Sequence, residues 1–533
     1  MTTIPRRRFL LSSTAVAGSG LLPAVLRAQA APAAITRDGA RPLLPSGVQS
    51  GDVLADRAIV WARASRDARL WLEWSTTAGF ANATRVRGPD LLLASGDGTG
   101  RIDLQGLPAG QDIFYRVVLE DLGSASVRSP AVPGHFRTPQ AADGPATRPL
   151  RLVWSGDTAG QGFGINEAFG GMRIYEAMRK TNPDLFIHSG DTVYADGPIP
   201  AELKLRDGTL WKNLVTPEVG KVAETLDEFR GRHRYNLMDA NVRAFGAEVA
   251  QIWQWDDHEV SNNYSDSKSV VNDARYTEKN VQLLAARGQR AFMEYAPMRP
   301  FGAAEPQRVY RHLPQGPLAD VFVLDMRSYR GPNSHNLQTT ESAETDFLGR
   351  PQVDWLLAGL KRSRATWKII AADMPISLFV PDGKDAEGRA RWEAVANGDH
   401  GAPKGREMEI ARLLKGIKDA GIRNVVWLTA DVHYTAAHHF SPERAKFQDF
   451  DPFWEFVSGP LNAGGFGPNE MDKTFGGEVV FQKGAGYDNS APTEGYQFFG
   501  QVDIDHRSQA LTVTLKDLDG QALFTRTLEA QRA

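Results

Sequence analysis

The chain has 533 residues, 23% of them charged, and a formal net charge of -3 at pH 7. That length suggests two to four domains, each able to bury a core. The mixed charges form no basic stripe, which argues against nucleic acid as a stable partner. The absence of cysteine excludes disulfides, thiolate catalysis and cysteine-ligated metals, so any bound metal would use oxygen and imidazole ligands.

Residues 1–30 have the layout of a signal peptide. The basic start Arg6-Arg7-Arg8 precedes a mildly apolar stretch, and Ala28-Gln29-Ala30 is a small-x-small cleavage pattern. An arginine pair followed by x-Phe-Leu resembles a twin-arginine signal, a route that carries folded proteins. Serine, glycine and proline interrupt the apolar stretch, which makes it a poor membrane span. We expect transient use of the twin-arginine machinery, no permanent membrane anchor and a periplasmic or secreted product. A lipid-facing anchor or a disordered basic tail is the alternative.

Residues 45–139 are predicted to form an N-terminal β-sandwich domain. Apolar runs occupy residues 57–63 and 112–120, and residues 68–74 alternate polar and apolar side chains with period two. Glycine and proline cluster between these runs. Short strands at this spacing favour a small antiparallel sandwich.

Residues 148–530 are predicted to form an α/β catalytic domain. Apolar strand-like runs alternate with helical patterns near residues 174–180, 280–295, 352–363 and 407–420. The runs are nearly continuous, as expected for strands that are covered on both faces. Alternating segments after Phe498 are expected to extend the catalytic sheet rather than form a separate domain.

Six of the apolar runs end in an acidic residue. These residues are Asp157, Asp191, Asp256, Asp325, Asp373 and Asp431. Ligands of open α/β sheets gather at the carboxyl ends of strands, so these ends can deliver side chains from distant parts of the chain to one place.

The ends of two of these runs suit a metal centre. The carboxylate of Asp191 can bridge two cations, and the phenol of Tyr194 can join the same site and favours a trivalent ion such as ferric iron. Asp257 and His258 belong to an ionisable run that is costly to bury without a metal. The structural alternatives are a turn for Asp191 and a solvated loop or helix cap for the ionisable run.

Two further strand ends carry candidate site residues. Asp431 and His433 are two residues apart, so they point the same way on an extended segment. His438 follows them and is expected to lie outside the ligand set, and a surface histidine cluster is the structural alternative. Arg327 could bind a phosphate or form a structural ion pair.

The order Gly-Asp, Gly-Asp-x-x-Tyr, Asp-His-Glu and Asp-x-His resembles calcineurin-like metallophosphoesterases. More closely, the chain resembles the PhoD-like alkaline phosphatases over nearly all of the mature sequence. The supporting stretches are residues 48–52, 186–196, 255–263, 325–331 and 453–460. The resemblance implies a metallophosphoesterase sandwich core, preceded by a small all-β domain of the immunoglobulin or fibronectin type.

The resemblance also implies the site residues. The metal ligands would be Asp157, Asp191, Tyr194, Asp257, Asp431 and His433. The resemblance places His258 near the phosphoryl group, and we predict that His258, Asp257 and Arg327 carry catalysis. The implied metals are Fe(III) with Ca²⁺. Some members of the family place a cysteine ligand where this chain has Asp157, so zinc and manganese are alternatives.

The expected function is hydrolysis of small phosphate esters by a metal-activated water, of the alkaline phosphatase type. A phosphodiesterase or phospholipase D-type activity on the same scaffold is one alternative. A surface binding protein with a degenerate site and a calcium-binding structural module are others. An enzyme requires Asp191, Asp257, His258 and His433 to converge on one pocket.

Overall fold

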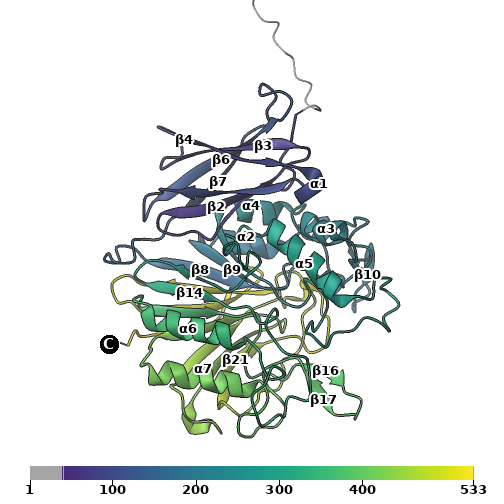
Figure 1. Cartoon of the computed structure of the whole chain (residues 1–533), viewed down its shortest axis with the longest axis vertical. Helices are drawn as coiled ribbons and strands as arrows, with labels where there is room; N and C mark the ends of the chain where they lie inside the picture. The colour runs from purple at the N-terminus through teal and green to yellow at the C-terminus, as the bar shows by residue number, and fades with distance from the viewer. Residues whose placement is uncertain (1–38, 40, 532–533) are drawn as a thin grey trace, which may run out of the picture. The chain divides into compact units, whose positions relative to one another are not determined.

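The computed structural model describes residue 39 and residues 41–531. The predicted signal peptide, residues 1–30, lies outside the described residues. From Pro42 onward the structure contains two large sheets, one four-stranded sheet, two small hairpins and helices on the outer faces of the large sheets (Figure 1). None of the helices in residues 41–531 is long and apolar enough to cross a membrane.

The first large sheet has nine strands and joins segments from both ends of the described chain. Its order is β24 (Ala522–Leu528), β23 (Leu511–Asp517), β22 (Phe498–Ile504), β8 (Leu150–Ser155), β9 (Leu185–Ser189), β12 (Ala250–Gln254), β1 (Val48–Gly51), β2 (Arg57–Arg63) and β5 (Thr99–Gln105). The central strands β8, β9 and β12 are parallel. The C-terminal strands therefore extend the catalytic sheet, as the sequence predicts.

The second large sheet has seven strands. Its order is β13 (Arg311–Pro314), β14 (Ala319–Val323), β15 (Trp367–Ala371), β18 (Val425–Thr429), β20 (Phe453–Val457), β19 (Thr435–Phe440) and β21 (Gly477–Lys483). Strands β14, β15, β18 and β20 are parallel. The two small hairpins are β10 (Glu202–Lys204) with β11 (Leu210–Lys212), and β16 (Pro381–Lys384) with β17 (Ala390–Trp392).

The two large sheets pack face to face, with helices outside them. The period-two alternation of strand side chains produces this layering. In β18, Val426 and Leu428 point into the core between the sheets, whereas Trp427 points into a second core with Leu414 of helix α7. On the other sheet, Val153 of β8 packs in a third core with Ile174 of α2. Strands buried on both faces explain the nearly continuous apolar runs.

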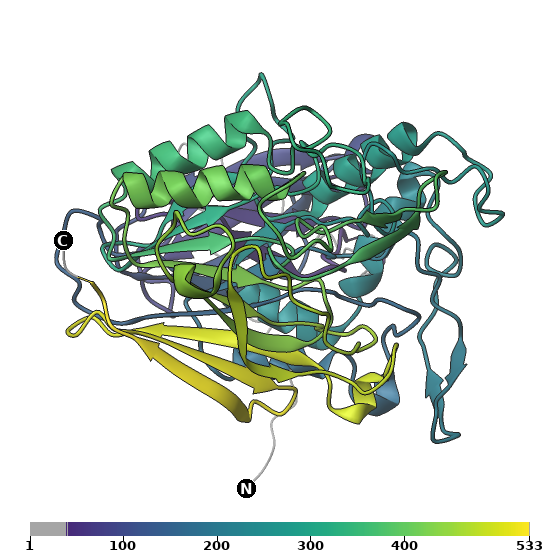
Figure 2. The same cartoon turned by 90° about the horizontal axis from the view of Figure 1, so that it is seen from below.

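Of the helices in residues 41–531, the four that begin at residues 173, 281, 350 and 407 follow their expected positions with small shifts at the ends, and the other three were not predicted. The helices are α1 (Leu93–Gly96), α2 (Arg173–Arg179), α3 (Leu226–Asn236), α4 (Ala240–Glu248), α5 (Val281–Tyr295), α6 (Arg350–Arg362) and α7 (Glu407–Asp419), with short 3₁₀ turns η2 (Glu167–Phe169), η3 (Pro442–Arg444) and η4 (Pro492–Glu494). Helices α6 and α7 lie side by side on the second sheet, away from the yellow C-terminal strands (Figures 1 and 2). Helix α3 begins with a capping box formed by Thr225 and Glu228.

The predicted N-terminal β-sandwich is continuous with the catalytic sheet. Its separate sheet has the order β4 (Thr84–Leu91), β3 (Ala68–Ser75), β6 (Asp112–Asp121) and β7 (Val132–Arg137). Its remaining strands β1, β2 and β5 belong to the nine-stranded sheet, where β1 pairs in parallel with β12 at Gly51 and Gln251. Residues 45–139 thus share backbone hydrogen bonds with the catalytic region, although the sequence suggests a boundary there.

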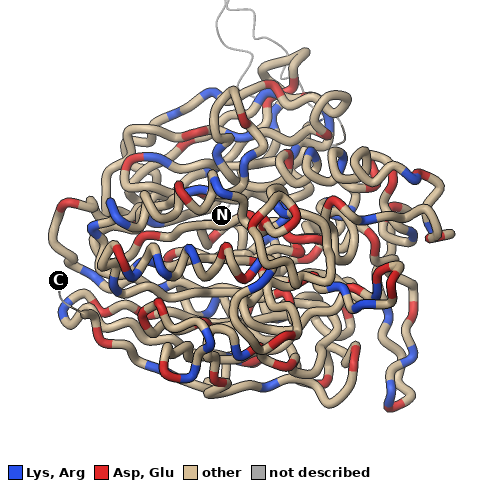
Figure 3. Tube along the Cα trace, turned by 60° about the horizontal axis from the view of Figure 1, so that its bottom comes forward, with Lys and Arg blue, Asp and Glu red and all other residues tan. Residues whose placement is uncertain are grey.

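Positive and negative side chains are interspersed along the chain from Pro42 onward (Figure 3). Within this mixture, one group of acidic side chains is buried at the carboxyl ends of the central strands. That group forms the candidate site.

Candidate metal centre

The carboxyl ends of six parallel strands carry the acidic residues that the sequence singles out. Asp157 follows β8, Asp191 follows β9 and Asp256 follows β12, while the second sheet contributes Asp325, Asp373 and Asp431. Five of these six residues are at most 1% exposed, and the side chain of Asp431 is 11% exposed. Asp325 is a turn residue, because its carboxylate accepts hydrogen bonds from the backbone amides of Arg327 and Ser328.

Tight turns after the strands aim these side chains inward. Asp157, Asp191 and Asp431 have φ angles of 69°, 50° and 67°, a left-handed conformation that aspartate tolerates better than most residues. Gly190 has a φ of +98°, and a Cβ atom at this position would lie 2.5 Å from the Cβ of Asp256. Glycine is therefore needed where the β9 and β12 loops touch.

Asp157, Asp191 and His433 form the first candidate group for a cation. One ligand atom from each lies within 4.8 Å of the others. The hydroxyl of Tyr194 is 2.8 Å from Nε2 of His433, which adds a phenol to the group. Nδ1 of His433 is 2.5 Å from the carbonyl oxygen of Gly464. Because Nδ1 donates to that carbonyl, Nε2 carries the free lone pair that a metal requires.

Asp191, Asp257 and His258 form a second candidate group, which shares Asp191 with the first. Nδ1 of His258 lies 2.6 Å from Oδ1 of Asp196, and its ring centroid is 4.2 Å from that of Tyr194. Burial opposes a charge on the ring, but Asp196 and Asp257 outweigh it and raise the pKa of His258 to about 10. Asp196 and Asp257 therefore favour the cationic form of the His258 ring.

Asp256, Asp257 and Asp431 form a third candidate group. Arg327 lies against it, with Nη2 3.7 Å from Oδ1 of Asp431 and 4.0 Å from Oδ1 of Asp257. Its Nε atom pairs with Asp256, and the side chain has no exposed surface. The structure thus favours the ion-pair alternative for Arg327 over direct contact with a substrate phosphate.

The electrostatics of the site fit bound cations. Burial and neighbouring carboxylates raise the pKa values of Asp157, Asp191 and Asp431 well above their ordinary range. Oδ2 of Asp157 and Oδ2 of Asp256 are buried without a hydrogen-bond partner. Burying a carboxylate charge without a partner costs free energy, and a bound cation reduces that cost. Oxygen and imidazole donors suit iron, calcium, manganese and zinc. The residues present therefore fit a metal cluster.

All six residues predicted as metal ligands lie in or beside these three groups. Asp157, Asp191, Asp257, Asp431 and His433 are members, and Tyr194 joins through its hydroxyl contact. His438, which the sequence places outside the ligand set, is bonded to Glu455 instead. Asp191 links His433 of the first group to Asp257 and His258 of the second, so these four residues lie close together.

Several residues around the ligands were missed as site residues. Glu259 ties the β9 loop to the β12 loop, because its carboxylate accepts hydrogen bonds from the backbone amides of Thr192 and Asp256. Asp196 orients His258, and the backbone amide of Asn263 donates to Asp257. Asp196 lies two residues after Tyr194, and Glu259 directly follows His258. This closeness in the sequence is the feature from which they could have been predicted.

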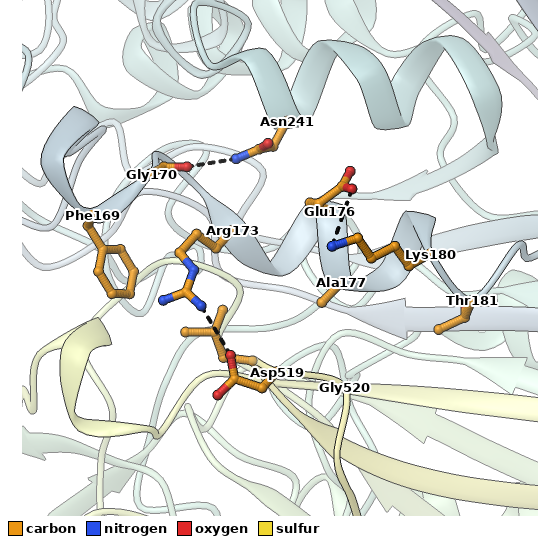
Figure 4. A pocket seen from close by; sticks show the side chains of 11 residues that line it. Phe169, Gly170, Arg173, Glu176, Ala177, Lys180, Thr181, Asn241, Asp519 and Gly520 are labelled. Atoms are coloured by element: carbon orange, nitrogen blue, oxygen red, sulfur yellow. Dashed lines mark hydrogen bonds and ion pairs between the residues drawn. The ribbon is translucent and has the colours of Figure 1, made fainter.

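A separate surface pocket of about 510 Å³ lies between α2 and the turn that joins β23 and β24 (Figure 4). It is lined by Phe169, Glu176 and the exposed ion pair of Arg173 with Asp519, whose side-chain atoms are 3.1 Å apart. None of the candidate metal ligands lines this pocket. The candidate metal centre is therefore at the strand ends and not in this pocket.

Solved structures of other proteins share this fold. A structure of PhoD superposes with a TM-score of 0.67 at 20% identity, covering 92% of both chains. The purple acid phosphatase PPD1 from yellow lupin seeds superposes with a TM-score of 0.56 at 13% identity, covering 92% of this chain and 74% of its own.

Sequence comparison identifies the family. The PhoD-like phosphatase model matches residues 152–515, and the model of the PhoD-like phosphatase N-terminal domain matches residues 28–140. Alkaline phosphatase D of Bacillus subtilis (strain 168) is 27% identical over 453 residues, which cover 80% of this chain and 71% of that protein. The chain belongs to the PhoD-like phosphatase family and is a phosphoric ester hydrolase.

Proposed function

We propose that the chain is an exported, metal-dependent phosphatase of the alkaline phosphatase type. One observation supports the proposed metal dependence. Asp191 is shared by the first and second candidate groups, and Asp257 is shared by the second and third. A carboxylate shared in this way can bridge two cations about 3.5–4 Å apart, as in two-metal phosphatases. When bound, such cations make water nucleophilic at neutral pH and stabilise charge on the phosphoryl oxygens.

The donor chemistry suggests different metals for the two groups. Tyr194, Asp157 and His433 offer phenol, carboxylate and imidazole, which suit Fe(III). Asp257 and Asp191 add carboxylate oxygens, the ligands that Ca²⁺ takes. Zinc and manganese are the alternatives, since each accepts imidazole or carboxylate ligands. Asp257 acts as a ligand in this proposal.

His258 is the proposed catalytic acid. Asp196 holds Nδ1 and keeps the ring cationic, so the second ring nitrogen can donate to a phosphoryl oxygen or to the leaving alkoxide. The His258 side chain is 12% exposed and that of Asp431 is 11% exposed, whereas Asp157 is 1% exposed. This small opening supports a terminal phosphoryl group, and hence a small monoester, as the substrate.

The test combines elemental analysis with two chromogenic substrates, p-nitrophenyl phosphate and its bis-ester. Asp191→Asn should lose bound metal and turnover together, because Asp191 belongs to two of the groups. Asp207→Asn, in the exposed turn between β10 and β11, is the matched control and should retain both. Unchanged activity in Asp191→Asn would refute the proposal. Faster hydrolysis of the bis-ester by the wild type would favour the phosphodiesterase alternative.

The proposal that the protein is exported rests on the sequence of residues 1–30 alone. The twin-arginine pattern predicts that these residues carry a folded reporter across the cytoplasmic membrane to the periplasm or medium. Changing both Arg6 and Arg7 to lysine should trap the reporter in the cytoplasm, whereas Arg8→Lys, outside the pair, should leave export intact. A reporter that is exported equally by all three sequences would contradict the twin-arginine route.

A further inference from the structure

A basic hollow of about 800 Å³ lies where the carboxyl-terminal ends of α6 and α7 meet the turn between β22 and β23. The basic residues that line it are Lys361, Arg364, Lys368, Arg423 and Arg507. Among the described residues, no aspartate or glutamate lines it. The whole chain has a formal net charge of -3, so this excess of positive charge is local. A hollow lined by charges of one sign attracts ions of the opposite sign.

The five basic residues come from distant parts of the chain. Lys361 lies in the last turn of α6, Arg364 follows that helix, and Lys368 is the second residue of β15. Arg423 lies in the turn between α7 and β18, and Arg507 lies in the turn between β22 and β23. The fold therefore gathers these charges in one place, and they do not form a single basic run in the sequence.

The protein itself does not neutralise this hollow. Within residues 41–531, none of its five basic side chains forms an ion pair with an aspartate or a glutamate. Asp320 acts on Lys368, but its Oδ1 atom lies 3.3 Å from Nε2 of His312. Asp505 accepts a hydrogen bond from the backbone amide of Arg507. Like charges in one hollow repel one another, and a bound anion would remove that repulsion.

The inner wall of the basic hollow offers hydrogen-bond donors. The side chain of Lys368 is half-buried, and burial lowers the pKa of its ammonium group, an effect that Asp320 opposes. The ammonium group donates to the carbonyl oxygen of Ala365 at 2.8 Å, which leaves donors for a ligand because an ammonium group has three. Oγ of Ser363 is buried without a hydrogen-bond partner. Phosphate oxygens are strong acceptors for such groups.

The basic hollow lies at the opposite edge of the second sheet from the metal centre. Lys368 is near the start of β15 and Asp373 follows its end, while Arg423 precedes β18 and Asp431 follows it. A strand of 5 residues, such as β15, spans roughly 17 Å. An anion held in the hollow is therefore out of reach of the acidic residues at the strand ends.

We propose that the basic hollow is a binding site for a compact anion that carries two or three phosphate groups. The ends of α6 and α7 each carry roughly half a negative charge, which leaves about four of the five positive charges to be balanced. A single phosphate group carries only about two negative charges. Three of the five residues are arginines, whose planar guanidinium groups bind two phosphate oxygens at once. The ligand is bound and not hydrolysed there, so the proposal does not rest on the proposed function.

The test measures binding of a triphosphate analogue in which methylene groups replace the bridging oxygens, so that a phosphatase cannot cleave it. Isothermal titration calorimetry should give a Kd for the wild type that rises with added NaCl, because salt screens the charges. Arg364→Ala combined with Arg423→Ala should raise Kd at least roughly tenfold, since two charge-assisted hydrogen-bonding groups are lost. Both side chains are exposed, so the midpoint of thermal unfolding should not change. Arg507→Ala alone should raise Kd by a smaller factor.

Lys212→Ala combined with Arg350→Ala is the matched control. It removes the same net charge from side chains that are 68% and 82% exposed and lie outside the basic hollow, so Kd should not change. Binding of the analogue at the metal centre is common to all these proteins, so differences between them report on the hollow. Arg364→Lys combined with Arg423→Lys keeps both charges and should bind more tightly than the alanine pair.

Two results would overturn the proposal. One is an equal Kd in the wild type and the alanine pair at Arg364 and Arg423, and the other is an equal loss of affinity in the control pair. Orthophosphate tests the choice of ligand. If the alanine pair weakens the binding of orthophosphate as much as it weakens the binding of the analogue, the hollow is a site for single phosphate ions and the proposed ligand class is wrong.

Discussion

Nδ1 of His258 lies 2.6 Å from Oδ1 of Asp196, and the second carboxylate oxygen of Asp196 accepts a hydrogen bond of 2.8 Å from the backbone amide of Asn262. Asp196 belongs to the loop that follows β9 and carries Asp191, and from that loop it fixes the tautomer and orientation of the proposed catalytic acid. Because Asp196 is itself outside the three candidate cation groups, its contribution can be separated from metal binding.

Replacing Asp196 with asparagine should lower turnover without removing metal. Asparagine keeps the shape of the side chain but loses the charge that favours the cationic ring, so kcat should fall roughly 10²-fold, the usual contribution of a positioned general acid. The measurement is kcat with p-nitrophenyl phosphate, together with the metal content of the same preparation. Asp273→Asn, which alters an exposed pair with Arg275, is the control. A normal kcat in Asp196→Asn would rule out this role.

Gly190→Ala should disturb the contact between the β9 and β12 loops. The φ of +98° alone is unfavourable for alanine, and the added Cβ would lie 2.5 Å from the Cβ of Asp256. Gly208→Ala separates the two effects, because Gly208 has a φ of +87° with no atom within 4 Å of the added Cβ. Backbone strain should destabilise both variants by about 1–3 kcal/mol, and Gly190→Ala should lose more. Urea unfolding measures the difference, and equal losses would contradict the steric argument.

Acid should destabilise the fold partly through His233. This buried ring stacks on Tyr295 with 5.0 Å between centroids, and burial, with a smaller contribution from His188 and Arg234, lowers the pKa of His233 to about 3. The folded state therefore binds fewer protons than the unfolded state between about pH 6.5 and pH 3. Stability is lost as the pH falls through this window, by roughly 2 kcal/mol for this residue at pH 5.

His233→Phe keeps an aromatic ring in the stack and removes the titrating group. The midpoint of urea unfolding should therefore fall less between pH 7 and pH 5 in this variant than in the wild type. Comparing the two proteins cancels the contribution of the buried carboxylates, which is common to both. Parallel pH dependences would show that His233 does not contribute.

The sequence predicts the strand ends well because each signal is local. An apolar run followed by Gly-Asp, as at Gly190 and Asp191, specifies a buried strand and a tight turn within a few residues. Asp157 and Asp191 lie together because β8 and β9 are parallel neighbours, and Asp431 follows β18, a parallel strand of the second sheet. Which of these side chains hold metal ions stays a prediction until the ions are counted.

The partners of Arg327 could not be predicted in the same way. Asp256 and Glu393 are 71 and 66 residues away from it along the chain, and nothing in the sequence near Arg327 distinguishes such a pair from a phosphate contact. The pairing of β1 with β12 is equally non-local, because it joins Gly51 to Gln251. Long-range pairing is decided by the whole sheet rather than by a local pattern.

The nine-stranded sheet cannot be completed until the C-terminal strands have been synthesised. Strand β8 has β9 on one side and β22 on the other. Ser155 of β8 and Phe498 of β22, which share a hydrogen bond, are 343 residues apart, so the second neighbour of β8 leaves the ribosome long after the first. Until then β8 has an open edge that could pair with another chain. A nascent protein of this design would depend on protection of that edge, by chaperones or by slow collapse, until its final strands emerge.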